Sequence, residues 1–291
     1  MTAPARSYLF VPGDRPERFD KACHAGADSV IVDLEDAVAP AAKAAARAHL
    51  LAWLNSGTPV YVRINAAGTD WFGADLALCA HPGVAGIVLP KAERVADVEA
   101  VAGAGARAIL PLVESALGLW HAVDLCRAPR VERLVFGAID FCADLRMRES
   151  HANLLPARSQ LVLASRVAGI QAPVDGVTVA LDDMDAVRTD TLRARDLGFG
   201  AKLCIHPQQI QAVHAAFLPT PAELAWAGRV QAAFQAAQGA AVAVDGRMVD
   251  RPVLLLAEQM LHEATHRGGV DMQEDQSSKD QIHPPHPQET R

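Results

Sequence analysis

The stretch Ala-Ile-Leu-Pro-Leu-Val (residues 108–113) runs directly into Glu114, and the stretch Leu-Val-Phe-Gly-Ala-Ile (residues 134–139) runs directly into Asp140. Each apolar run predicts a buried strand that ends in one carboxylate. Acids at the ends of neighbouring strands can converge at the rim of a sheet. Two converging carboxylates suit a hard divalent cation that keeps its other positions for water and substrate.

Apolar runs of this kind recur along the chain, with stretches of helical character between them. Runs rich in Val, Ile and Leu that alternate with helices predict a parallel sheet covered by those helices. Eight such runs favour a closed (β/α)8 barrel, the TIM barrel, over an open sheet. The expected strands are residues 7–11, 29–34, 58–64, 85–90, 108–113, 134–139, 175–179 and 201–205.

Polar residues stand at or just after the carboxyl ends of several expected strands. In a barrel those ends share one face, and that face carries the active site. The sequence therefore predicts a site at this face. Its candidate residues are Asp33, Glu35, Arg63, Lys91, Glu114 and Asp140.

The chain after the barrel has a different composition. Residues 1–215 are expected to form the barrel, and residues 216–266 a helix-hairpin-helix segment that serves as a lid or in oligomerisation. The hairpin is expected at the Asp-Gly pair of residues 245–246, a strong turn signal. Residues 267–291 contain few apolar residues and are expected to be disordered.

Composition excludes several classes of protein. The chain has 291 residues, of which 51% are hydrophobic, and a net charge of -7, so nucleic-acid binding has no electrostatic support. No run approaches the roughly 18 apolar residues that span a bilayer, and the N-terminus lacks the apolar core of a signal peptide. Five scattered cysteines without a C-x-x-C pair indicate a reduced, cytoplasmic protein.

A set of short motifs in fixed order resembles the citrate lyase beta-subunit-like proteins of the HpcH/HpaI aldolase/citrate lyase superfamily. The resemblance covers roughly residues 6–262. One departure is Ala201, where these proteins usually have glycine, and the C-terminal tail is another. The motifs lie at residues 6–22, 32–38, 62–65, 89–91, 114–115, 137–140 and 198–207.

The resemblance implies a TIM barrel that binds Mg²⁺ and a β-hydroxyacyl thioester, close to malyl-CoA and citramalyl-CoA lyases. Such enzymes cleave a carbon–carbon bond to give an acyl-CoA and a 2-oxo acid. Glu114 and Asp140 match the metal ligands. The alternative is that each acid caps the helix after its strand.

Arg63 matches an arginine that is expected to hold the enolate oxygen or a carboxylate of the substrate. An ion pair with Glu35 or Asp36 is the alternative, and the two roles are compatible. Asp250 matches a catalytic acid or base carried on the lid of a neighbouring subunit, although it could instead cap the helix that follows.

Further substrate contacts are expected from Arg15 and Lys21, which could meet the phosphates or adenine end of CoA, and from Glu35, which could support Arg63 or a metal-bound water. A lid donated between subunits requires at least a dimer, and the resemblance suggests a homotrimer or hexamer.

Three other functions remain open at this point. The protein could be a thioesterase on malyl-CoA-type substrates, or a citrate lyase beta subunit that acts on an acyl-carrier-protein thioester. It could also be a non-catalytic barrel that binds CoA esters. The acyl group is open too, since glyoxylate and pyruvate differ by one methyl group, worth only about 1–3 kcal/mol of discrimination.

Overall fold

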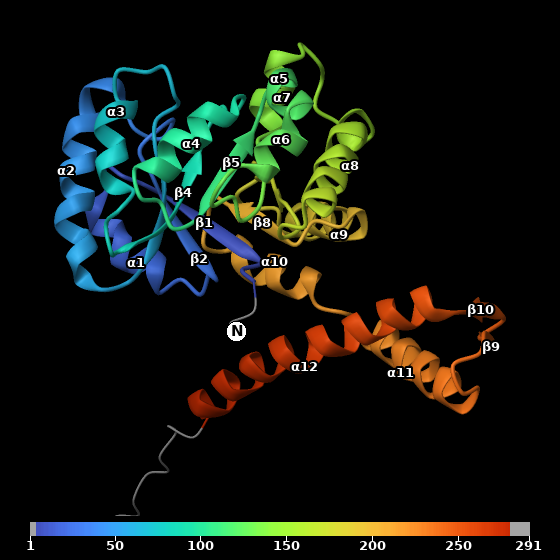
Figure 1. The fold of residues 1–291 in the computed structure, drawn as a ribbon. Helices are drawn as coiled ribbons and strands as arrows, with labels where there is room; N and C mark the ends of the chain where they lie inside the picture. The colour runs from blue at the N-terminus through green and yellow to red at the C-terminus, as the bar shows by residue number, and fades with distance from the viewer. Residues whose placement is uncertain (1–3, 280–291) are drawn as a thin grey trace, which may run out of the picture. The chain divides into compact units, whose positions relative to one another are not determined.

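The computed structural model describes residues 4–279, and residues 5–217 form one compact unit. Its core is a closed barrel in which eight parallel strands pair in chain order and the last pairs with the first. This confirms the predicted TIM-type barrel (Figure 1). The strands are β1 (Ser7–Pro12), β2 (Ser29–Asp33), β3 (Val60–Arg63), β4 (Val84–Leu89), β5 (Ile109–Val113), β6 (Val135–Phe136), β7 (Val174–Asp175) and β8 (Ala201–Cys204).

Helices follow the strands and cover the barrel from outside (Figure 1). Those of the barrel unit are α1 (Phe19–Cys23), α2 (Lys43–Trp53), α3 (Phe72–Asp75), α4 (Val95–Gly103), α5 (Ala116–Trp120), α6 (Ala122–Arg127), α7 (Ala138–Asp144), α8 (His151–Ala168), α9 (Met184–Leu197) and α10 (Gln209–Phe217). Short 3-10 turns occupy Pro16–Arg18, Pro40–Ala42, Leu54–Ser56 and Leu76–Leu78.

Alternation along each strand sorts side chains into two cores. On β5, Leu110 and Leu112 point into the barrel, whereas Ile109 and Val113 pack against the surrounding helices. This is the period of two that a pleated strand imposes. Continued by one step, the same alternation turns the next residue, Glu114, inward at the carboxyl end of the barrel.

The amino end of the barrel is filled by a polar plug. Arg133, 1% exposed, donates hydrogen bonds to the carbonyl oxygens of Ala5 (2.9 Å) and Ala172 (2.8 Å), and its guanidinium lies over the ring of Tyr8. Tyr8 packs edge-on against Tyr61. These contacts satisfy a buried charge and close the barrel below its apolar layers.

A buried ionic cluster lies on the outer side of the barrel, between β7, β8 and α8. Asp175 accepts from the Lys202 ammonium at 3.2 Å and lies 3.2 Å from the Arg158 guanidinium. Lys202 also donates to the carbonyl oxygen of Gly176 at 2.7 Å. The cluster ties two short strands to the helix that covers them.

The sixth strand is shorter than predicted. Residues 134–139 were expected to form it, but β6 ends at Phe136 and α7 begins at Ala138. The apolar residues that suggested a longer strand have helical spacing instead, since Ala138, Phe141 and Cys142 are buried on one face of α7. Asp140 therefore lies in the first turn of a helix and not at the end of a strand.

The chain from Leu218 onward forms a second unit. It contains α11 (Pro221–Ala236), β9 (Val242–Val244), β10 (Arg247–Val249) and α12 (Arg251–Lys279). The two strands form the expected antiparallel hairpin. Asp245 (φ 52°) and Gly246 (φ 75°) both have positive φ, as a two-residue type I′ turn requires.

Apolar side chains from α11, the hairpin and α12 share a small core around Ala227, Val230 and Ala257. The helix α12 runs to Lys279, beyond residue 266, where the helix-hairpin-helix segment was expected to end. A helix that is already nucleated by packing adds residues at little cost. Residues 267–279 thus differ from the expected disorder, and residues 280–291 lie outside the described residues.

None of the helices described within residues 4–279 has both the length and the hydropathy needed to cross a membrane.

Candidate active site

Two adjoining cavities open at the carboxyl end of the barrel. One, of about 350 Å³, has an apolar floor that includes Phe10, Leu112 and Leu203. The other, of about 890 Å³, is polar and lies over the loops that follow β2, β3 and β4. Their lining sets share the three carboxylates of Asp36, Glu114 and Asp140. The face that was predicted to carry the site therefore has a concave region.

Arg63, the last residue of β3, is held in a fork by Asp33, the last residue of β2. Its Nε donates to Asp33 Oδ1 at 2.7 Å and its Nη2 to Asp33 Oδ2 at 2.6 Å. The same carboxylate accepts the backbone N–H groups of Glu35 (2.9 Å) and Ala37 (3.0 Å). The two residues are register partners on adjacent strands, so both turn inward together.

The expected partners of Arg63 are also in place, at longer distances. Its Nη1 lies 3.1 Å from Glu35 Oε2 and 3.7 Å from Asp36 Oδ2. The guanidinium stacks over the ring of Phe10, 4.8 Å from its centre. Burial works against the charge, but the hydrogen bonds and the charge of Asp33 outweigh it and raise the pKa of Arg63 above its ordinary value. Arg63 is a permanent, fixed cation on the wall of the smaller cavity.

Lys91 connects two acids of the site. Its ammonium lies 3.0 Å from Glu35 Oε1, and its backbone N–H donates to Glu114 Oε1 at 2.6 Å. The φ angle of Lys91 is 48°, a left-handed conformation that is uncommon for residues other than glycine. This turn of the backbone directs the N–H toward Glu114.

Glu114 is 4% exposed and tightly confined. A Cβ atom added at Gly137 would lie 2.6 Å from Glu114 Cβ and 2.8 Å from its Oε2, so only glycine fits beside the carboxylate. Burial, with the nearby negative charge of Glu35 as the next cause, raises the pKa of Glu114 to about 8. The metal-free site therefore tends to keep a proton on this acid at neutral pH.

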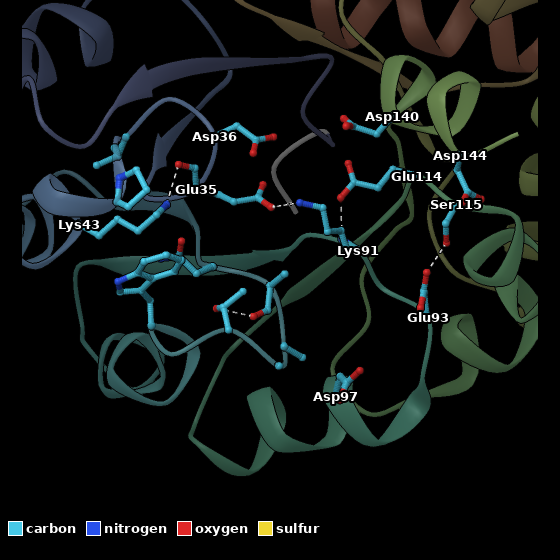
Figure 2. A pocket seen from close by; sticks show the side chains of 18 of the residues that line it. Glu35, Asp36, Lys43, Lys91, Glu93, Asp97, Glu114, Ser115, Asp140 and Asp144 are labelled. Carbon is cyan, nitrogen blue, oxygen red and sulfur yellow. Dashed lines mark hydrogen bonds and ion pairs between the residues drawn. The ribbon is translucent and has the colours of Figure 1, made fainter. Parts of the chain in front are cut away.

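Asp140 reaches the same space from the first turn of α7. Figure 2 shows the carboxylates of Glu114 and Asp140 facing one region of the cavity. The negative charge of Asp140 is among the causes that raise the pKa of Glu114, which places the two acids within electrostatic reach. A first-turn acid also complements the positive end of the helix. The two predicted metal ligands are thus brought together.

A family model for HpcH/HpaI aldolase/citrate lyase matches residues 6–207 of the chain. The chain belongs to this family. A citrate lyase subunit beta-like protein of Deinococcus radiodurans is 38% identical over 91% of this chain and 100% of its own length. A (3S)-malyl-CoA thioesterase of Cereibacter sphaeroides is 36% identical over 90% of this chain and 95% of its own length.

The family fold is matched in solved structures as well. The protein CitE of Mycobacterium tuberculosis, in complex with magnesium, acetoacetate and coenzyme A, has a TM-score of 0.83 and 38% identity. The match covers 91% of this chain and all of that one. This agreement extends the shared fold beyond the barrel that the family model matches.

The residues of this family member fit a hard divalent cation. Among the described residues no group of three or more His, Cys, Asp or Glu side chains is arranged to hold a metal. Glu114 and Asp140 provide two hard oxygen donors, and one Glu114 oxygen is already taken by the Lys91 N–H. Mg²⁺ is commonly bound by one or two carboxylates and retained water, so this donor set suits it.

Other predicted residues are not brought to the two cavities. Arg15 follows β1 and Lys21 lies on α1; both are exposed, and neither lines either cavity. Asp250 belongs to the second unit, where its Oδ1 lies 3.4 Å from the Val253 N–H at the start of α12. A substrate role for these three residues stays a prediction.

Two residues of the site were not assigned a role from the sequence. Asp33 is the principal partner of Arg63, although Glu35 and Asp36 were expected. The period-two alternation of β2, which turns Ile31 inward, would have pointed to Asp33. Lys43 is 6% exposed and donates to the carbonyl oxygens of Leu34 (2.9 Å) and Glu35 (2.8 Å), which fixes the loop after β2.

Proposed function

We propose that the protein is a Mg²⁺-dependent carbon–carbon lyase that cleaves a short β-hydroxyacyl-CoA, of the citramalyl-CoA or malyl-CoA type, to an acyl-CoA and a 2-oxo acid. The observation that carries the proposal is the meeting of Glu114, Asp140 and the fixed cation Arg63 on one cavity at the barrel mouth. The magnesium and coenzyme A complex of the related CitE protein supports the choice of ligands.

Glu114 and Asp140 are the residues that would hold Mg²⁺. When bound, the ion would supply Lewis-acid stabilisation of charge on the oxo-acid oxygen. One oxygen of Glu114, Oε1, accepts the Lys91 N–H, so the Glu114 carboxylate would be held in place when it binds the ion. Gly137 has no side chain that could cover Glu114 Oε2, so this oxygen stays accessible from the cavity.

Arg63 provides a positive charge that needs no proton transfer and little reorganisation. Its Nε and Nη2 are committed to Asp33, so the remaining donors on Nη1 face Glu35, Asp36 and the cavity. A guanidinium fixed in this way stabilises a carboxylate or an enolate oxygen through preorganised charge. The stacking of Arg63 on Phe10 further restricts its rotation.

The apolar floor beneath these charges keeps water away from the reacting atoms. Leu112 and Leu203 are buried, and Phe136 lines the same cavity. A low-dielectric floor strengthens the charge–charge interactions above it. A carbanion-like enolate would be protected there from adventitious protonation by solvent.

We propose Asp250 as the group that takes the hydroxyl proton of the substrate during cleavage. It is partly exposed and immediately precedes α12. Its weak contact with the Val253 N–H, at 3.4 Å, is compatible with a capping role as well. The lid would come from a neighbouring subunit, which makes the active form a homo-oligomer, as a trimer or hexamer.

Arg15 and Lys21 are proposed contacts for the phosphates of CoA. Both cations are exposed, Arg15 after β1 and Lys21 on α1, and neither lines either cavity. The polar cavity itself carries an excess of acidic side chains, which makes it a poor site for the CoA phosphates. This favours a separate place for the nucleotide.

The decisive test is product identification. Purified protein with MgCl₂ is incubated with citramalyl-CoA and malyl-CoA, and the products are separated by chromatography and mass spectrometry. An acyl-CoA and an equimolar 2-oxo acid support the lyase. The Asp140→Ala variant should lose turnover, and full activity in excess chelator would exclude the metal assignment.

A thioesterase is the second candidate, favoured by the 36% identity to a (3S)-malyl-CoA thioesterase. Free CoA with malate or citramalate, and no oxo acid, would identify it in the same experiment. Activity that appears only with an acyl-carrier-protein thioester would instead identify a citrate lyase beta subunit. An Asp250→Asn variant that still binds Mg²⁺ but loses turnover would support the proton-transfer role.

A further inference from the structure

Glu35 is a buried acid that lies beside the proposed metal ligands without joining them. It is 5% exposed, and its Oε1 accepts from the Lys91 ammonium at 3.0 Å. Its Oε2 lies 3.1 Å from Arg63 Nη1, yet no donor among the described residues makes a hydrogen bond to it with good geometry. A buried, incompletely satisfied carboxylate oxygen has a strong preference for a cation.

Glu35 also lies within electrostatic reach of Glu114. After burial, the negative charge of Glu35 is the largest cause of the raised pKa of Glu114. Both acids line the larger cavity, together with Asp140. A divalent cation held by Glu114 and Asp140 would therefore attract Glu35 as a third ligand.

The ion pair with Lys91 opposes that attraction. Figure 2 shows the Glu35 carboxylate directed at the Lys91 side chain, while the Lys91 backbone meets Glu114. The left-handed backbone at Lys91, with φ 48°, makes the two contacts possible at once. Backbone strain at a non-glycine residue persists where surrounding contacts fix it, as they do on both sides here.

We propose that Lys91 is a positioning residue that keeps Glu35 out of the coordination shell of the metal held by Glu114 and Asp140. This inference rests on the proposed function, because it concerns the same metal. Mg²⁺ demands a nearly octahedral set of oxygens, so a third carboxylate would occupy a position that water or substrate needs. Lys91 preserves a weaker but more open metal site.

In the Lys91→Met variant we expect the affinity for the metal to rise while the number of water molecules on the ion falls. Titration calorimetry with MgCl₂ should show binding tighter by roughly threefold to tenfold, because carboxylate number governs the affinity of such sites. Water-proton relaxation with Mn²⁺ as the probe should show fewer exchangeable waters on the ion. The backbone N–H to Glu114 is retained in this variant, so the Glu114 contact remains.

Two further variants separate release of Glu35 from a general change in charge. Arg94→Met removes a cation that lines the same cavity and pairs with Asp97 rather than Glu35. It should leave the number of bound waters unchanged. In the Lys91→Met/Glu35→Gln double variant, the tighter Mg²⁺ binding should disappear and the lost water should return.

Several results would overturn the inference. Unchanged or weaker Mg²⁺ binding in both Lys91→Met and Lys91→Gln would contradict it, as would tightening that persists in the double variant or is matched by Arg94→Met. Circular dichroism of each variant checks that it is folded. If the wild-type protein binds neither Mg²⁺ nor Mn²⁺, the metal assignment of the proposed function fails first. Wild-type binding without the predicted response of the variants refutes the role of Lys91 alone.

Discussion

Mg²⁺ affinity is expected to fall steeply as pH is lowered, because Glu114, the proposed metal ligand, would have to lose a proton before binding the ion. Burial, followed by the charge of Glu35, raises the pKa of Glu114 to about 8 in the metal-free protein. Below that pKa the competition between proton and metal weakens binding by about tenfold for each pH unit. The dissociation constant should therefore rise by roughly a hundredfold between pH 9 and pH 6.

Titration calorimetry from pH 6 to pH 9 measures this dependence directly. Near pH 7, repeating the titration in two buffers with different protonation enthalpies should reveal the release of close to one proton per metal ion. The Glu114→Gln variant is the control: it should bind Mg²⁺ weakly and without that proton release. A wild-type dissociation constant that changes by less than about twofold across the range would refute the reasoning.

Four further changes test other contacts. In the metal-free folded protein Glu114 keeps a proton that the unfolded chain gives up near pH 4.5. The free energy of unfolding should therefore fall as pH rises from about 4.5 to about 8. Urea unfolding of the Glu114→Gln variant should lack this fall. Asp33→Ala should lower the free energy of unfolding in urea by about 3–5 kcal/mol, since the buried Arg63 loses its bidentate hydrogen bonds to Asp33. A loss below about 1 kcal/mol would contradict this. Gly137→Ala should displace Glu114 and cost about 1–3 kcal/mol, and Mg²⁺ binding that stays at the wild-type level would argue against the close packing. Lys202→Met should lower the free energy of unfolding by about 1–3 kcal/mol, measured by thermal and urea unfolding, because the fully buried Asp175 loses one of its two cationic partners and keeps Arg158.

The barrel could be predicted from the sequence because its strands are short, apolar and regularly spaced between helices. The position of Arg63 and Glu114 at the ends of expected strands also pointed to the carboxyl face of the barrel. Strand lengths were harder to predict: β6 ends at Phe136, and the next residue, Gly137, packs closely against Glu114, which is far from it in the sequence. Sequence periodicity does not contain that contact, and Asp140, which was expected just past the end of a strand, lies on α7.

The partners of the site residues were harder to predict than the residues themselves. Asp33 holds Arg63 because β2 and β3 pair in a register that places them side by side, and register depends on the closed barrel. The left-handed backbone at Lys91 has no sequence signal, since lysine rarely adopts it. The role of Asp250 depends on where the second unit lies in an assembled oligomer, and it stays a prediction.

The plug at the amino end of the barrel has a kinetic consequence. Arg133, Tyr8 and Tyr61 fill that end, so molecules reach the apolar cavity only through the carboxyl mouth of the described barrel. Two reactants that share one entrance pass each other with difficulty. In the proposed lyase reaction, the reactant that sits deeper would bind first in condensation and leave last in cleavage. Product-inhibition kinetics should accordingly indicate a compulsory order of binding and release. Inhibition should be competitive for only one pair of substrate and product.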